Sequence, residues 1–545
     1  MGTKIFNVLL LFSRIFVGSL FIVSGMIKAN DPTGFSYKME EYFSEDALNW
    51  TFFEPYALFI AALICIAEIV LGFAVLFGGK AKLTSWLLMA MILFFLALTF
   101  YTATCDPQST YKAMVGGVEI DKQVQCVTDC GCFGDALKGT IGRSLTPWES
   151  FTKDVILFFF VLPILIGSYI FSPKRLQKKS NELDTSDTAV PGYRFALNTP
   201  KQDSIILVGS TVFILLFAGY FFQWMFPVYF SVVCFGIYVL LKKRHVKFMG
   251  PDWTIAIVMT LISTAFAVYT TSYLPVKDFT AYAVGNDIKE KMNDGVAGVF
   301  ETKVVYLNKQ TGKKKTFQLT DPEWQDTTIW KWDTTLNEEV KKGRIASISS
   351  FNPEGDYEML TAAEKNHPAL KQIIDQQINS YYQRLMAINS VAYGTDSIDP
   401  IDYNQETYPD SAFKVLGISE KLLNKDKHFM IDHKNYLTEL PNVILFTMLH
   451  AETAYTGSMD DIKTIIANAT KAGVPVYILT ASGKPETDKL EKQFKLNARY
   501  LTMDETELKI VVRANPGLIM LKKGVVTGKW PGRGLPDWGD IKEKL

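Results

Sequence analysis

Residues 57–78 read ALFIAALICIAEIVLGFAVLFG, an apolar run with one charged side chain, that of Glu68. A helix needs ~20 apolar residues to cross a bilayer, and this run meets that length. The run at 225–241 is short and joins its predecessor through Gln223 and Trp224 only, so a re-entrant pair is the alternative for these two runs. The sequence predicts an α-helical transmembrane bundle of seven spans, the other six being near residues 5–27, 84–104, 151–172, 204–222, 225–241 and 254–273.

The composition divides the chain into a membrane half and a soluble half. Long apolar runs stop near residue 273, and the sequence from 274 onward has the mixed composition of a globular protein. The 56 Lys and Arg residues balance the 56 Asp and Glu residues, so the net charge does not favour nucleic acid. We therefore expect the lipid bilayer as a partner, no nucleic acid, and a folded region outside the membrane.

Basic residues predict the orientation of the spans, because cytoplasmic connections are rich in Lys and Arg. They gather in alternate connections: Lys80 and Lys82, then Lys174, Arg175, Lys178 and Lys179, then Lys242, Lys243, Arg244 and Lys247. Connections 28–56 and 105–150 and the segment 274–545 then face outward. The first run contains Arg14 and lacks a small-residue cleavage site, which favours a retained span. We expect a multi-pass protein of a bacterial inner membrane, with a cytoplasmic N-terminus and a periplasmic C-terminal region.

Four of the six cysteines lie in one outward connection, as Cys105, Cys126, Cys130 and Cys132. The other two are within spans, and the soluble half has none. Thiols in an oxidising compartment favour disulfides, here with three connectivities that the sequence leaves open. The spacing is unusual for zinc and the connection lacks histidine, so we expect no metal site.

The segment Cys130-Gly131-Cys132-Phe133-Gly134-Asp135 is the candidate catalytic site. A disulfide across one intervening residue closes a strained ring that is easily reduced, which suits an electron carrier. Asp135 is a candidate proton acceptor beside these thiols. In this interpretation Cys105 and Cys126 are structural or resolving thiols, and two purely structural disulfides are the alternative.

Arg14 and Glu68 are each a charge deep within a predicted span. At a rise of ~1.5 Å per residue, Arg14 lies about 13 Å from the inner end of its helix and Glu68 about 16 Å from the outer end of its own. Charges at such depth are costly unless paired. We therefore predict an intramembrane Arg14–Glu68 pair that locks two helices, binds a quinone head group or relays protons toward the outer thiols.

These features resemble DoxX/MauE-type redox-associated membrane proteins. The likeness rests on Arg14, the Ser24-Gly25 to Lys28 turn, Asp31-Pro32, Glu68 and the Cys-Gly-Cys-Phe-Gly-Asp segment. Bacteroidetes versions add further spans and an extracytoplasmic thioredoxin-like domain, with a junction similar to residues 274–279, Leu-Pro-Val-Lys-Asp-Phe. The resemblance implies a four-helix core plus about three further spans, and thiol–disulfide or quinone-linked electron transfer. A methylamine role comes with the name of the MauE branch alone, because no residue here indicates an amine substrate.

The soluble half has the alternating pattern of an α/β domain. Short apolar strands are predicted at 443–449, 475–480 and 517–521, separated by helices near 458–472 and 485–494. Upstream, 303–307 and 314–319 alternate as strands joined by a turn at 308–312. The predicted organisation is a membrane domain 1–172, a linker 173–203, added spans 204–273, a β-rich unit 274–350, an insertion of unknown fold 351–440 and a thioredoxin-like domain 441–545.

Arg513-Ala514-Asn515-Pro516-Gly517 resembles the cis-proline segment of thioredoxins. The position of the usual thiols holds Leu449-His450-Ala451-Glu452-Thr453 instead, so this domain has no exchange chemistry of its own. His450 lacks a nucleophile beside it and is not assigned a catalytic role. We expect a peptide-binding groove at Asn515 and Pro516 that takes an extended segment through main-chain hydrogen bonds.

Within the insertion, a helix is expected near 367–388, and the acidic, tyrosine-rich stretch 393–411 is expected to be an irregular loop or a docking surface. Two functions follow for the whole chain. One is an inner-membrane redox module whose soluble region recruits an envelope partner, with a membrane quinone as candidate cofactor. The other is a membrane scaffold, fastened by disulfides, whose thiol-free domain binds that partner. A transporter ranks third, because no inverted repeat is visible.

Overall fold

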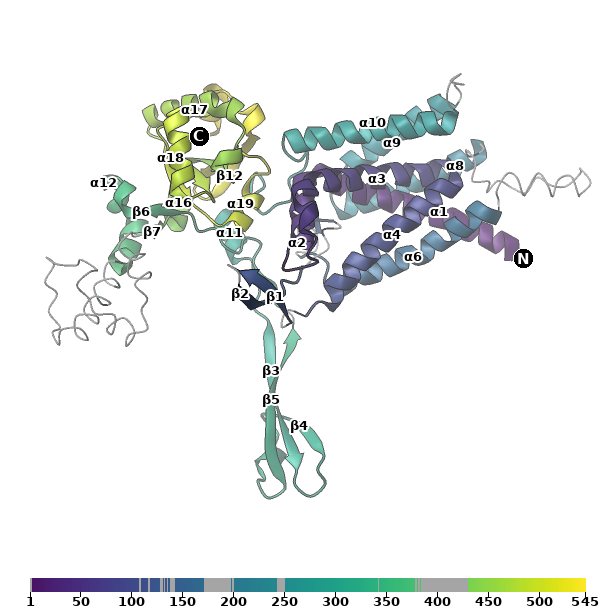
Figure 1. The fold of residues 1–545 in the computed structure, drawn as a ribbon, viewed down its shortest axis with the longest axis horizontal. Coiled ribbons are helices and arrows are strands. Elements are labelled where there is room, and N and C mark those ends of the chain that lie inside the picture. The colour runs from purple at the N-terminus through teal and green to yellow at the C-terminus, as the bar shows by residue number, and fades with distance from the viewer. Residues whose placement is uncertain are drawn as a thin grey trace, which may run out of the picture.

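The computed structural model describes residues 2–106, 109–115, 118–127, 131, 133–134, 136–137, 143–170, 198, 200–242, 250–341, 343–377, 380, 383 and 430–545. Within these residues, a helical bundle carries a mixed α/β region at one end and the N-terminus at the other (Figure 1). A slender β arm projects from the junction between the two parts.

Six described helices are long and apolar enough to cross a membrane, as six of the seven predicted runs require. The sixth run forms a helix of only 17 residues, α9, so its crossing of the bilayer stays a prediction. The helix α8 continues as a π-helical segment, η2 (Leu215–Phe221). The bundle consists of α1 (Gly2–Asn30), α3 (Ala57–Phe77), α4 (Ala81–Thr104), α6 (Pro147–Ile170), α8 (Pro200–Ile214), α9 (Phe226–Lys242) and α10 (Pro251–Ser272).

The helices α8 and α9 are antiparallel neighbours. Tyr238 and Lys242 in the last turns of α9 both bind Asp203 in the first turn of α8, at 2.8 and 2.5 Å. The far ends of the pair are joined by the short connection 222–225. Both helices therefore span the same height of the bundle.

Glycines bring α1 and α3 into close contact. A Cβ added to Gly72 would lie 2.8 Å from the carbonyl oxygen of Gly18, and one on Gly25 would lie 2.9 Å from the Cβ of Glu68. Only glycine permits this approach, which is common where membrane helices pack. This close contact sets the position of α1 along its own axis relative to Glu68 on α3.

The end of the bundle near the α/β region carries a short helix, α2 (Pro32–Phe43), and a hairpin (Figure 1). Asp31 caps α2 by accepting a hydrogen bond from Gly34 N, and Pro32 occupies the first helical position. The sequence motif Asp31-Pro32 is therefore a helix start. The hairpin consists of β1 (Thr110–Val115) and β2 (Val118–Gln123), an antiparallel pair.

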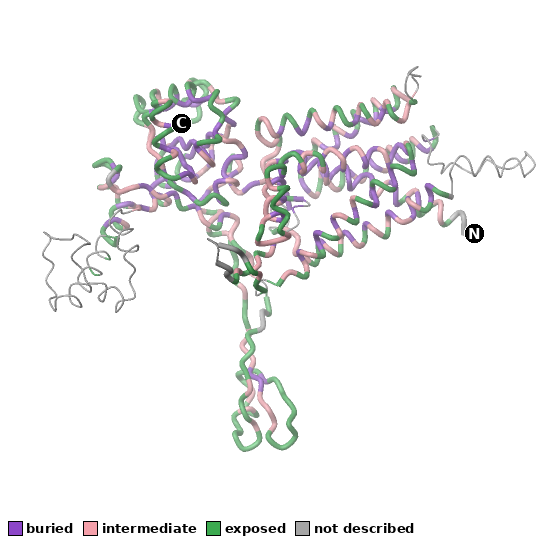
Figure 2. Tube along the Cα trace, viewed as in Figure 1, coloured by how far each residue is buried: buried purple, intermediate pink, exposed green. Residues whose placement is uncertain are grey.

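The β arm consists of β3 (Val299–Asn308), β4 (Lys314–Gln318) and β5 (Trp330–Lys341) in the order β4-β3-β5. The first two strands were predicted, and β5 was not. The arm is mostly exposed, as Figure 2 shows, and its described buried residues are Val304, Val305 and Phe317. A small aromatic cluster at the tip holds it together, with Phe317 4.9 Å from Trp330 between ring centroids.

The α/β region contains one seven-stranded sheet in the order β12-β11-β8-β9-β10-β6-β7. Its centre, β8, β9 and β10, is parallel, and β11, β12, β6 and β7 pair antiparallel to their neighbours. The predicted strands and helices of this region are confirmed. The strands are β6 (Glu354–Asp356), β7 (Met430–Asp432), β8 (Val443–Met448), β9 (Val476–Thr480), β10 (Arg499–Thr502), β11 (Gly517–Lys522) and β12 (Val525–Pro531).

Helices cover both faces of this sheet. Residues of β8 alternate between two apolar cores, so the strand reads as a continuous apolar run. One core is covered by α17 (Met459–Lys471), α18 (Lys484–Phe494) and α20 (Trp538–Lys544). The other is covered by α11 (Ile288–Asn293), α16 (Lys434–Glu439) and α19 (Glu505–Val511).

The insertion predicted at 351–440 is in part integral to this domain. Its strands β6 and β7 extend the sheet, and the short helix α12 (Ala362–Lys365) contributes Glu364, whose carboxylate binds Tyr477 and Arg499. Residues 368–377 are helical, within the expected helix 367–388. The stretch 393–411 lies outside the described residues.

Candidate functional site

A buried ion pair lies in the bundle core between Lys28 and Glu68. Lys28 Nζ donates to Glu68 Oε1 at 2.5 Å, and the side chains are 2% and 3% exposed. Lys28 is in the last turn of α1, which continues as a helix through the predicted turn at 24–28. Its ammonium also lies 4.4 Å from the ring centroid of Phe95. Glu68 is therefore neutralised by a residue at the C-terminal end of α1.

The predicted Arg14–Glu68 pair is wrong, because Glu68 binds Lys28 and Arg14 binds other groups. Arg14 donates to the carbonyl oxygens of Val75 and Leu76, each at 3.0 Å, and to Asn198 Oδ1 at 2.8 Å. Those carbonyls belong to the last turn of α3. The carbonyl oxygens of a last turn have no backbone N–H of the same helix from which to accept a hydrogen bond. Arg14 and Lys28 are ~21 Å apart along α1, so only Lys28 reaches Glu68.

A second charged pair, formed by the half-buried Lys153 and the buried Asp154, is near the first. Asp154 on α6 is 1% exposed and binds Lys153 at 2.6 Å and Thr99 at 3.0 Å. Both pairs line a small inner cavity of about 20 Å³, together with Ser24 and Phe133. This volume accommodates about one water molecule. Glu68 Oε2 is buried there without a hydrogen-bond partner among the described residues.

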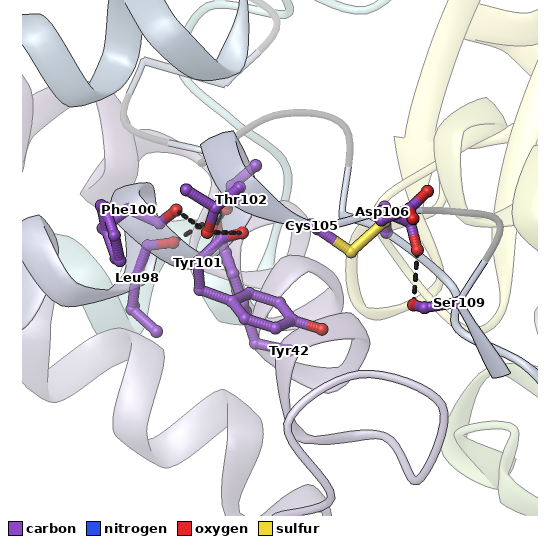
Figure 3. Close-up of a disulfide and its surroundings, with 10 residues drawn as sticks. Tyr42, Leu98, Phe100, Tyr101, Thr102, Cys105, Asp106 and Ser109 are labelled. Carbon is purple, nitrogen blue, oxygen red and sulfur yellow. Dashed lines mark hydrogen bonds between the residues drawn. A yellow bond between two sulfur atoms is a disulfide. The ribbon is translucent and has the colours of Figure 1, made fainter. Parts of the chain in front are cut away.

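Cys105 and Cys126 form a disulfide, the arrangement expected when these two thiols hold the outward connection. It joins the end of α4 to the segment after β2 (Figure 3). Tyr42 on α2 and Thr102 on α4 share a hydrogen bond of 2.8 Å one turn away. Cys130, Cys132 and Asp135 lie outside the described residues, and their predicted roles stay predictions.

Described neighbours of those thiols line an outer cavity of about 170 Å³. This cavity is where the bundle, the cysteine segment and the α/β region meet. Phe133 and Lys28 line both the outer and the inner cavity, so they form the partition between them. The residues that line the outer cavity lie within 27–41, 275–280 and 506–513 and at positions 131, 133, 134 and 136.

Gly131 presses against α2 at this cavity. It has φ +64°, and a Cβ placed on it would lie 3.3 Å from Lys38 Cγ. Gly134 also has a positive φ, of +49°, but a Cβ there would meet nothing within 4 Å. Glycine 131 thus brings the segment close to a lysine whose ammonium binds Glu41 at 2.9 Å.

Ion pairs fasten the α/β region to the bundle. Arg513 Nε binds Asp31 Oδ2 at 2.8 Å, and Lys509 Nζ lies 3.5 Å from Glu40 Oε2. Tyr37 lies beneath both cations, and burial raises the pKa of its hydroxyl to about 12. Lys529 binds Asp278 at 2.5 Å, and burial lowers the pKa of this lysine.

The proposed peptide groove is at Asn515 and Pro516, which are joined by a cis peptide bond. The backbone oxygen of Asn515 already accepts a hydrogen bond from Tyr455 N at 3.0 Å, so this atom is not open to a partner's main chain. A groove cavity of about 170 Å³ lies beside Asn515 and is closed on its other side by Thr33, Tyr37, Leu58 and Thr271 of the bundle. The groove therefore faces the protein's own membrane part.

The sequence did not single out Lys28, Asp154 and Arg513 as site residues. Lys28 and Asp154 stand at the ends of apolar runs, where a charge is ordinarily taken as interfacial. Arg513 is separated from Asp31 by 482 positions, and no local pattern links them. His450 lies 3.6 Å from the exposed Glu505, and no group of three or more His, Cys, Asp or Glu side chains in the described part of the chain is arranged to hold a metal.

The fold and these contacts define a multi-pass membrane protein with an α/β region outside the bundle. Apolar helices of this length fit a lipid bilayer. A family model described as methylamine utilisation protein MauE matches residues 6–108, which hold α1 to α4 with Lys28, Glu68 and Cys105. This segment therefore fits a MauE/DoxX-type membrane protein. No curated protein and no solved structure matches the chain.

Proposed function

We propose that the protein is a membrane redox module that exchanges electrons through Cys130 and Cys132 at the outer face of a bacterial inner membrane. The observation that carries this proposal is that Gly131 and Phe133, the neighbours of Cys132, line the outer cavity above the Lys28–Glu68 pair. A cation–carboxylate pair between that cavity and the inner cavity is placed to take up or release protons when thiols are oxidised or reduced. The match to MauE over 6–108 supports a redox-associated role.

The α/β region is proposed to be a thioredoxin-like domain that lacks thiols. Its central parallel strands, the cis Asn515–Pro516 bond and the closing hairpin β11–β12 support this assignment. The basic residues of the connections predict a cytoplasmic N-terminus and a periplasmic α/β region, and their location at opposite ends of the bundle supports this (Figure 1). Its role is to bind a partner rather than to exchange disulfides.

A membrane quinone is the candidate oxidant of the thiols. The outer cavity is chemically suited to such a group, because it has aromatic walls formed by Phe35, Tyr37, Phe133 and Phe279. Thr280 lines the same cavity, and its hydroxyl is buried without a partner among the described residues. When bound, a quinone accepts two electrons and two protons.

The second candidate function is a non-enzymatic scaffold. The Cys105–Cys126 disulfide and the Arg513–Asp31 ion pair favour it, because the first crosslinks the connection after α4 and the second joins the α/β region to the start of α2. The substitutions Cys132→Ser and Cys105→Ser separate the two functions. A redox module loses thiol exchange in Cys132→Ser while its melting temperature is kept, and a scaffold shows no exchange and loses stability in Cys105→Ser only.

A further inference from the structure

The β arm has two unlike faces. Tyr306 on β3 pairs with Lys315 on β4 and with Trp332 on β5. Paired residues share a side of a sheet and successive residues alternate, so every second residue of β3 belongs on the side of Tyr306. The opposite side carries Lys303, Lys314, Lys331 and Leu336. All the aromatic rings of the three strands fall on the first side, which we call the aromatic face: Phe300, Tyr306, Phe317, Trp330 and Trp332.

The arm does not bury its aromatic face by itself. Of these rings only Phe317 is buried, and Lys315 Nζ lies 4.7 Å from its ring centroid. The side chains of Phe300 and Trp332 are 62% and 57% exposed. The described part of the chain places no second layer over the arm (Figure 1). Because an exposed face of this kind marks a contact with another surface, the aromatic face is an interaction surface.

The direction of the arm limits what the aromatic face can meet. A membrane lies across the axes of the helices that span it. The arm runs across the direction of α3 and α10, beside the end of the bundle near the α/β region (Figure 1). It therefore follows the membrane surface instead of projecting away from it. The strand β3 has 10 residues, so at ~3.3 Å per residue the arm reaches roughly 30 Å along that surface.

Exposed aromatic side chains also mark this end of the bundle. They stand where α3 and α6 begin and where α10 ends. Trp and Tyr gather where spanning helices meet the lipid headgroups, because their rings are apolar and carry one polar atom. The aromatic face has the same residue types beside this belt, which favours lipid as its partner. The belt includes Trp50, Tyr56, Trp148 and Tyr273, each at least 42% exposed.

The base of the arm is tied to the α/β region. Ser347 N and Oγ donate to the carboxylate of Asp294 at 2.8 and 2.6 Å. Ile348 N donates to the carbonyl oxygen of Lys291 on α11 at 3.1 Å. The position of the arm is therefore passed on to α11 through hydrogen bonds.

We propose that the β arm is a membrane-surface anchor whose aromatic face lies in the headgroup layer of the bilayer around the bundle. Trp332 Nε1 has a long hydrogen bond, 3.4 Å to Thr335 Oγ1, and donates to a phospholipid oxygen instead. Residues 299–341 contain seven Lys and seven Asp or Glu residues, so the anchor does not require an anionic lipid. The anchor holds the α/β region in one orientation on the membrane, and this role is independent of the redox function.

Photocrosslinking of the full-length protein tests the anchor. The protein is placed singly in nanodiscs of phosphatidylcholine and, separately, kept in native membranes. Trp332→p-benzoylphenylalanine puts a photoreactive ring on the aromatic face. The matched variant is Leu336→p-benzoylphenylalanine, because Leu336 is 47% exposed on the opposite face.

We expect phospholipid adducts at position 332 in both preparations, in a yield several times that at position 336, as measured by mass spectrometry. Equal yields at the two positions would overturn the inference. So would adducts at 332 with a second copy of the chain or with another envelope protein in native membranes, because the aromatic face would then have a protein partner.

Tryptophan fluorescence gives a second measurement that needs no crosslinker. The emission of the unaltered protein minus that of Trp332→Thr is the emission of Trp332. In nanodiscs of dibrominated phosphatidylcholine we expect most of this emission to be lost by quenching. Trp148→Phe gives the reference for a tryptophan of the belt, and both variants remove an exposed ring, so the melting temperature should hold. Emission of Trp332 that is equally strong in brominated and ordinary lipid would contradict the anchor.

Discussion

Lys28 Nζ and Glu68 Oε1 lie 2.5 Å apart in the core of the bundle, and both side chains are almost fully buried. Removing one partner leaves an unpaired charge in an apolar environment, which costs ~3–5 kcal/mol in comparable buried pairs. Lys28→Met and Glu68→Leu should therefore each lower the free energy of unfolding by about that amount. The double substitution should cost much less, because neither charge remains.

Thermal unfolding in detergent, followed by circular dichroism, measures this difference. The double variant is also the informative one for function. If it folds and exchanges thiols at the normal rate, the pair is only a structural lock.

Arg513 and Asp31 should hold the α/β region on α2. Their contact of 2.8 Å is largely buried, and hydrogen bonds to charged groups contribute ~1.5–3 kcal/mol. Arg513→Met should increase amide hydrogen exchange in α2 and α19 while the seven-stranded sheet keeps its protection. Asp31→Asn is the matched variant, because its amide oxygen still caps α2 at Gly34 N but the negative charge is lost. Unchanged exchange in both variants would show that other contacts dock the domain.

Gly131 and Gly134 form a matched pair for testing the cysteine segment. Both have a positive φ, so alanine costs ~1–2 kcal/mol of backbone strain at either position. Only at 131 does the added methyl group meet Lys38 and Phe35. Gly131→Ala should therefore slow thiol exchange more than Gly134→Ala. Stopped-flow reduction of the two variants measures this, and equal rates would mean that contact with α2 does not position the thiols.

His433 should make the α/β region sensitive to acid. Its side chain is fully buried, and burial lowers its pKa, although its bond to Ile431 O and the charges of Glu364 and Asp432 oppose this and Arg499 adds to it. The unfolded chain then binds a proton more readily than the folded one. Stability should be constant above about pH 7 and fall as the pH drops below about 6.5. Melting temperatures of His433→Leu should show a weaker fall over this interval, and an identical fall would assign it to other groups.

Hydropathy predicted the spans because the length and polarity of a membrane helix are local properties. The strands β8, β9 and β11 were predicted for the same reason, since each is an apolar run. The partner of Glu68 was not predicted, because its identity depends on how far α1 extends and on how closely Gly25 lets α1 approach α3. The strand β5 is largely exposed and β6 and β7 have three residues each, too few for a pattern.

The candidate site, like the fold, could be predicted from the sequence only in part. Cys105 and Cys126 could be proposed as structural thiols from the sequence, because both lie in the predicted outward connection 105–150 apart from the closely spaced Cys130 and Cys132. The closure of the groove at Asn515 by Tyr37 and Leu58 joins residues more than 450 positions apart, and only the folded chain shows it.

The central claim is that Cys130 and Cys132 are a labile redox pair beside a rigid Cys105–Cys126 disulfide. Acid-trapped thiol labelling of the protein in native membranes, with disulfide mapping before and after addition of a mild reductant or a quinone, tests it most directly. The account predicts that Cys130 and Cys132 alone change state, with Cys105 and Cys126 oxidised throughout. Four cysteines that stay fully oxidised under every condition would contradict it and favour the scaffold.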